Sequence, residues 1–242
     1  RINKTSGSVI LSSNVNIEST LELQNGLLDL NSRTLSVLNS LPSGIQRTGG
    51  GIQSEKSNNS SKILWQINSS LGIYIFPFSK NDTTYIPITF EHTSGNAGNV
   101  TASTYGTSSS NLPWPTTPVA VTYFNNSSGQ NDSAATVDRF WHIDVSGSAI
   151  ANLTLTYSPT ELPLPPFNNP LNTKAQNYSA GMWNTYSSLQ SSGTYFVNIP
   201  SISDFSTFAI TNISSPLPIE LLNFEAFLKE GIVITNWVTA SE

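Results

Sequence analysis

The feature that most constrains this chain is a period-two alternation of side chains in residues 137–157. In each of two runs, 140–145 and 153–156, the side chains fall into two alternating sets. Such alternation is typical of a β-strand with one face in a core. Because Ser146-Gly147-Ser148 between the runs is a turn signal, we expect an antiparallel hairpin in the middle of a β-sandwich.

Spacing and composition extend the β pattern over most of the 242 residues. Strand-like runs recur with turn signals between them and no convincing helix, which predicts an all-β fold with an Ig-like sandwich at 51–215. Charged residues make up only 10% of the chain, where about a quarter is usual. The surface must therefore be built from Ser, Thr and Asn, which suits an extracellular or cell-surface β-protein. Aromatic residues at 10% are enough for a core and exclude a disordered chain.

The N-terminal part, residues 1–50, carries a repeat. Short apolar pairs recur there every six or seven residues, with Ser, Asn and Gly between them: Val9/Leu11, Val15/Ile17, Leu21/Leu23, Leu28/Leu30 and Leu35/Val37. Short strands with inward pairs and polar corners predict a parallel β-solenoid, with three strands to a coil of about 20 residues. A meander of antiparallel strands is the alternative.

The last part, residues 216–242, follows a Ser/Pro break and contains two further strand patterns at 219–227 and 232–238. Two strands alone are marginally stable in water. We therefore expect them to begin a further Ig-like module, to pair with the sandwich, or to associate with another chain.

Charge and cysteine content narrow the partners. The net charge is −5 with no basic stripe, so nucleic acid is not an expected partner. There is no cysteine, which excludes disulfides and thiolate chemistry. No apolar run reaches the roughly 20 residues that a membrane-spanning helix needs. The chain starts at Arg1 without a signal peptide, and we expect it to be a piece of a longer precursor.

Several stretches resemble surface proteins that the Bacteroidota export through the type IX secretion system. The tail resembles the Ig-like module that often precedes the sorting signal, in LPIELL at 217–222 and NWVTASE at 236–242. VDRFWHIDVSG at 137–147 and LELQNGLLDLNSRTLSV at 21–37 are similar to segments of large repetitive, adhesin-like proteins of this group. The resemblance implies export across the outer membrane, with the secretion machinery as a partner.

The same resemblance implies modification. Asp82-Thr83-Thr84 and Asp132-Ser133-Ala134 fit the pattern that the Bacteroidota use for O-glycosylation, so Thr83 and Ser133 are the candidate acceptors. Both lie in predicted polar loops, where a bulky solubilising glycan is tolerated.

No residue pattern indicates catalysis. The two histidines, His92 and His142, are far apart, and no nucleophile motif appears. Asp138, Asp144, Glu161 and Asp204 offer carboxylates, but most of them are better interpreted as strand-end or turn residues. We therefore expect no enzyme, no cofactor and no catalytic or metal residue, with Ca²⁺ at the 81–82 or 131–132 loop as the one metal to consider.

Exposed aromatic side chains could stack on sugar rings. Trp114, Trp183 and Tyr186 are the candidates, with core or loop-anchoring roles as the alternative. The expected function is a non-catalytic structural segment of a secreted or surface protein, acting in adhesion, as a stalk or in a filament. The alternatives are a glycan-binding module attached to an enzyme, and cargo captured with the secretion machinery. We expect the functional contacts in loops 112–118 and 125–133 and in the C-terminal strands.

Overall fold

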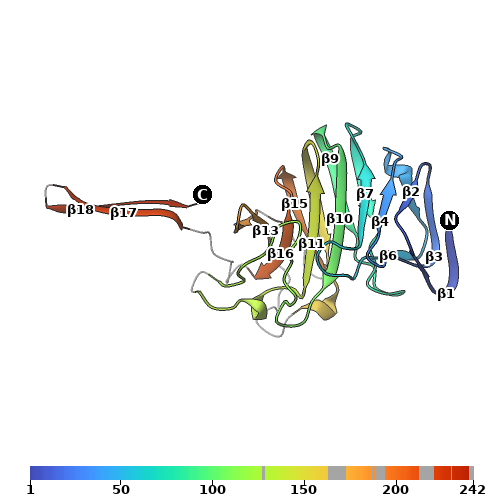
Figure 1. Cartoon of the computed structure of the whole chain (residues 1–242), viewed down its shortest axis with the longest axis horizontal. Coiled ribbons are helices and arrows are strands. Elements are labelled where there is room, and N and C mark those ends of the chain that lie inside the picture. Colours follow the sequence, from blue (N-terminus) through green and yellow to red (C-terminus); the bar gives the residue numbers. More distant parts are fainter. Residues whose placement is uncertain are drawn as a thin grey trace.

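The computed structural model describes residues 1–126, 129–162, 173–186, 188, 194–212, 221–229 and 231–239 (Figure 1). These residues form strands, with three short 3₁₀ turns at Pro42–Gly44, Ser133–Ala135 and Pro159–Glu161. The prediction of an all-β fold with a parallel solenoid-like start and an antiparallel sandwich is confirmed.

The N-terminal strands stack in parallel as two walls. One wall contains β1 (Ile2–Ile10), β3 (Leu21–Asp29), β5 (Ile45–Arg47) and β6 (Gly51–Gln53). The other contains β2 (Val15–Ile17), β4 (Thr34–Val37) and β7 (Lys62–Gln66). Val15 lies beside Leu35 and Leu35 beside Ile63, so successive coils advance by 20 and then 28 residues (35 − 15 and 63 − 35). The parallel repeat is therefore present. The first two coils have one strand in each wall, whereas the last coil has the three short strands β5, β6 and β7.

Strand β7 joins the solenoid to the sandwich. It pairs in parallel with β4 on one side and antiparallel with β10 (Asn99–Gly106) on the other. From β10 the same sheet continues through four more strands: β11 (Arg139–Val145), β16 (Thr207–Asn212), β13 (Thr173–Ser179) and β14 (Met182–Thr185). Sheet and core thus run continuously across the predicted boundary at residue 50 (Figure 1).

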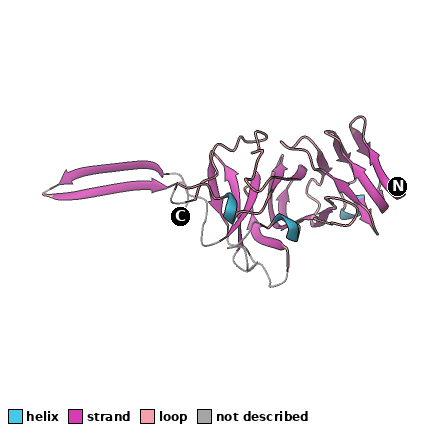
Figure 2. Cartoon of the chain, turned by 90° about the horizontal axis from the view of Figure 1, so that it is seen from below, coloured by secondary structure: helices cyan, strands magenta, loops and turns pink. Residues whose placement is uncertain are grey.

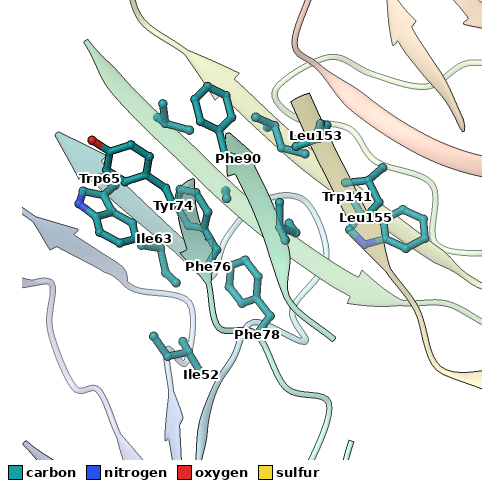
Figure 3. Close-up of a cluster of buried hydrophobic side chains, with 14 of the residues drawn as sticks. Ile52, Ile63, Trp65, Tyr74, Phe76, Phe78, Phe90, Trp141, Leu153 and Leu155 are labelled. Atoms are coloured by element: carbon teal, nitrogen blue, oxygen red, sulfur yellow. The ribbon is translucent and has the colours of Figure 1, made fainter. Parts of the chain in front are cut away.

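A smaller antiparallel sheet covers the inner face of the large one. Its order is β15 (Phe196–Ile202), β12 (Ser148–Thr156), β9 (Ile88–Asn96) and β8 (Gly72–Phe76). The core between the sheets is aromatic: the Trp65 ring lies edge-on to Tyr74 and Phe76 at centroid distances of 5.1 and 5.5 Å (Figure 3). Ile52 of the solenoid belongs to the same buried cluster.

The central stretch forms an arch between the sheets, so the predicted hairpin is wrong. β11 lies in the large sheet and β12 in the small one, and the turn at 146–148 carries the chain across. The amide of Gly147 donates to the Ala97 carbonyl oxygen at 3.1 Å, which locks this turn onto the neighbouring one. Across the core, Nε1 of Trp141 donates to the Thr156 carbonyl oxygen at 3.2 Å. Alternation is typical of a strand with a buried face, but it carries no information about which strand is the partner.

Both faces of β11 are buried, whereas the alternation predicted a single buried face. Its outer face carries Phe140 and His142, which lie under a second aromatic cluster with Tyr105, Phe124 and Trp183. The segment 119–124 is an irregular covering of this cluster. Beside it, β13 and β14 form a hairpin, since Ala180 and Gly181 both have positive φ and reverse the chain between these strands.

The C-terminal strands β17 (Leu221–Lys229) and β18 (Ile232–Thr239) pair with each other in a separate two-stranded sheet. This hairpin lies away from the sandwich in both views (Figures 1 and 2). Of the predicted tail at 216–242, residues 216–220, 230 and 240–242 lie outside the described part of the chain.

Candidate functional site

The three aromatic residues proposed from the sequence differ in burial, and Trp183 is not an open stacking platform. Trp183 is fully buried: its Nε1 donates to the Tyr123 carbonyl oxygen at 3.2 Å, and its ring lies 5.1 Å from that of Tyr178. Trp114 is half-buried against the second cluster, and Tyr186 against the main core. Burial and the nearby Asp204 raise the pKa of Tyr186 to about 12. The anchoring role, which was the alternative interpretation, describes Trp183 in particular.

The two candidate acceptors for modification share a local fold but differ in exposure. In each, the Asn two residues before the acceptor accepts from the acceptor's amide and hydroxyl: Asn81 Oδ1 from Thr83 at 3.0 and 2.9 Å, and Asn131 Oδ1 from Ser133 at 2.9 and 2.6 Å. This is an Asx turn, which Asn-Asp-Ser/Thr favours. Thr83 is exposed, whereas Ser133 is 7% exposed within a 3₁₀ turn.

Two of the candidate carboxylates lie close together: the amide of Asp138 donates to the Glu161 carbonyl oxygen at 2.8 Å, and burial and the charge of Glu161 raise the pKa of Asp138 to about 6. His92 contacts the carbonyl oxygens of Ser70 and Ser94, both at 2.9 Å, and His142 contacts the Thr207 hydroxyl at 2.8 Å. Asp144 and Asp204 are exposed. Among the described residues no three His, Cys, Asp or Glu side chains group as metal ligands, and no helix is long and apolar enough to cross a membrane.

A groove of about 450 Å³ lies elsewhere, at one end of the small sheet. It is lined by Thr83, Thr84, Tyr85, Thr156, Tyr157, Ser158, Pro159, Thr160, Tyr195 and Phe196. Every lining side chain is aromatic, hydroxylated or proline, and none is charged. The volume is within the range of small-ligand sites. Loops 112–118 and 125–133, where we expected functional contacts, do not contribute to it.

The first wall is the segment that ends at Tyr85. It is closed by a backbone bridge between Ser79 and Tyr85 and by the amide of Lys80, which donates to the Thr84 carbonyl oxygen at 2.9 Å. The guanidinium carbon of Arg47 lies 3.8 Å from the centre of the Tyr85 ring. This cation–π contact covers one ring face and fixes Tyr85 as part of the wall.

The second wall comes from the ends of β12 and β15. Thr156 and Phe196 are paired in register, and the amide of Tyr157 donates to the Tyr195 carbonyl oxygen at 2.9 Å. The Tyr157 ring is buried and stands edge-on to Tyr195, with 6.0 Å between centroids. Tyr195 and Phe196 are 39% and 37% exposed, so their rings are the apolar surface that the groove offers to solvent.

Charged side chains tie the two walls together. A carboxylate oxygen of Glu161 contacts Arg139 Nη2 at 2.6 Å and Lys80 Nζ at 3.1 Å. Lys80 belongs to the first wall, and Glu161 ends the 3₁₀ turn of the second, where it forms a capping box with Ser158. Burial alone would raise the pKa of Glu161, but the hydrogen bond and charge of Arg139 hold it below its usual value.

Arg139 is completely buried, and its guanidinium makes further hydrogen bonds. It donates to Thr104 Oγ1 at 2.9 Å and to Glu55 Oε1 at 2.8 Å. Removing one partner of such a network leaves an uncompensated buried charge, which is strongly destabilising. The network is therefore a structural support for the groove.

Sequence reasoning missed Arg139, Tyr195 and Phe196 as site residues. An arginine at the start of an apolar strand, and adjacent aromatic residues at the start of another, were the available signals. Neither pattern shows that the two segments meet.

Comparison with known proteins found no matching family model, curated protein or solved structure. Function must therefore be argued from the residues themselves.

The pH dependence of stability tests the burial of His142. Burial lowers the pKa of His142 to about 3, against 6.5 when it is exposed. Between these values the unfolded chain binds the proton and the folded chain does not, so this residue makes stability fall as pH drops from 6.5 toward 3. We expect urea unfolding at pH 7, 6 and 5 to show a shallower fall for His142→Gln than for the unmodified chain. Equal slopes for the two proteins would contradict a neutral, buried His142.

Proposed function

We propose that this chain is a non-catalytic structural segment of a secreted or surface-exposed bacterial protein, acting in adhesion, as a stalk or in a filament. The observation that carries the proposal is the sheet shared by solenoid and sandwich, in which β7 pairs with strands of both. A shared sheet transmits force through backbone hydrogen bonds and leaves no flexible linker between the two parts. This arrangement suits an element that holds other parts of a protein at a distance.

Surface chemistry and sequence resemblance support the location. A charge-poor surface of Ser, Thr and Asn is hydrated but uncharged, and the tail at 217–222 and 236–242 resembles type IX secretion cargo. We propose export across the outer membrane by that machinery. If modification occurs, the exposed Thr83 is the favoured acceptor over the buried Ser133.

Cell-surface labelling tests the location. In the producing bacterium, intact cells should bind an antibody raised against this chain, and external protease should remove the epitope. Disabling the type IX machinery should retain the protein inside the cell, while a periplasmic marker remains protected in both strains. Retention of the chain within cells that have intact machinery would refute the proposed export.

The alternative function, a glycan-binding module attached to an enzyme outside this chain, is favoured by one observation. The groove beside Tyr195 and Phe196 presents exposed rings among hydroxyl groups. The two functions are compatible if the structural segment also makes adhesive contacts.

We also propose that the C-terminal hairpin takes part in self-association. Phe224, Leu228 and Val233 are 58%, 72% and 65% exposed, and Leu228 lies opposite Val233 in the register. Alternation places Phe224 and Leu228 on the same face of β17. An isolated hairpin with such an apolar face is stabilised when the face is buried against another chain.

Sedimentation measurements test the hairpin. The chain should form dimers or larger species as its concentration rises, and Leu228→Lys with Val233→Lys should shift it to monomer. The matched control is Ile73→Lys with Ile75→Lys on β8, which changes two exposed apolar residues of the sandwich. A chain that stays monomeric at high concentration would contradict the proposal.

A further inference from the structure

We propose that the groove between residues 83–85, 156–160 and 195–196 binds a neutral saccharide, with Tyr195 and Phe196 as the stacking surface. This inference deepens the adhesive form of the proposed function and rests on it for its biological role. The binding itself is argued from the groove alone.

The mixture of groups in the lining selects the class of ligand. A sugar presents apolar C–H faces and, around its edge, hydroxyl groups that donate and accept. The groove offers the counterparts: exposed aromatic rings at Tyr195 and Phe196, and a rim of threonine and serine hydroxyls. Aromatic rings supply apolar contact with few rotatable bonds, and each hydroxyl is both a donor and an acceptor.

Two hydroxyl groups of the rim are available to a ligand. Within the described part of the chain, the side-chain hydroxyls of Thr84 and Thr156 make no hydrogen bond, and these residues belong to opposite walls. The hydroxyls of Ser158 and Thr160, by contrast, contact each other at 2.9 Å. A saccharide lying on Phe196 would therefore find one uncommitted hydroxyl on each wall.

Electrostatics restrict the ligand to a neutral one. No lining residue is charged. Of the charged side chains beside the lining, Lys80 is paired with Glu161, and Arg47 lies over Tyr85 while its Nε donates to the Gly50 carbonyl oxygen at 2.6 Å. A carboxylate or sulfate in the groove would give up water without a charged lining residue to pair with, which is costly.

The groove is held in shape before any ligand arrives. Its walls are fixed by the Glu161 contacts to Arg139 and Lys80 and by the register of β12 with β15. Binding therefore costs little conformational entropy of the protein, and preorganisation of this kind favours affinity.

A glycan array followed by calorimetry tests the inference. The chain, made in a host that does not O-glycosylate it, is applied to neutral, uronic-acid, sialylated and sulfated oligosaccharides. We expect binding among the neutral oligosaccharides alone, and the strongest neutral hit is then titrated. Phe196→Ala and Tyr195→Ala should each weaken that binding by about tenfold or more, since each removes a stacking ring. Phe196→Tyr should retain most of it.

Matched controls separate binding from folding. Ile150→Ala also removes an exposed apolar side chain of the small sheet, but near the start of β12 and outside the groove, and should leave saccharide binding unchanged. Each variant is accepted only if its thermal unfolding matches that of the unmodified chain, and Phe196→Tyr serves where Phe196→Ala fails this check.

Three results would overturn the inference. They are the absence of binding to any neutral oligosaccharide at millimolar concentration, selective binding of acidic ones, and binding that survives Tyr195→Ala with Phe196→Ala. Failure here leaves cell-surface labelling untouched, and failure of the labelling experiment leaves groove binding untouched, so the two proposals can be refuted separately.

Discussion

The structure depends on the way in which Trp65 fastens the solenoid to the sandwich. Its indole Nε1 donates to the Asn39 carbonyl oxygen, at a solenoid corner, at 2.8 Å, while its ring packs edge-on against Tyr74 and Phe76 of the small sheet. The Tyr74 hydroxyl makes a second connection to the solenoid by donating to the Ser40 carbonyl oxygen at 2.7 Å. A buried indole and phenol each need a partner for their polar atom, and here both partners are backbone groups of the solenoid. The two architectures therefore share one core (Figure 3).

Four charged side chains hold together segments that are distant in sequence. Arg139, Glu161, Lys80 and Glu55 come from four separate segments and converge beneath the groove. These contacts fix the shape of the groove, and the groove lining itself is uncharged. Shape and lining together define the ligand that we propose.

The sequence predicted the β class and the parallel repeat, because each of these follows from local periodicity. The runs 140–145 and 153–156 were correctly predicted as strands, but they were paired with each other when they belong to opposite sheets. Alternation is the same for a hairpin and for an arch, and only the packing of the tryptophan across the core decides between them. Trp183 illustrates the converse limit: an aromatic residue in a polar segment gives no local sign that loop 119–124 will cover it. The groove could not be predicted, since Tyr85, Thr156 and Phe196 are brought together only by the register of the sheets.

Amide hydrogen exchange tests most directly whether solenoid and sandwich are one cooperative body. Leu153→Ala opens a cavity in the sandwich core, which typically costs about 2–5 kcal/mol, at a residue of β12 far from β4 in sequence. If the two parts share one core, the amides of β4 and of β11 should lose protection by the same free energy in the variant. Loss of protection in β11 with β4 unchanged would show that the solenoid folds independently, and would contradict this account.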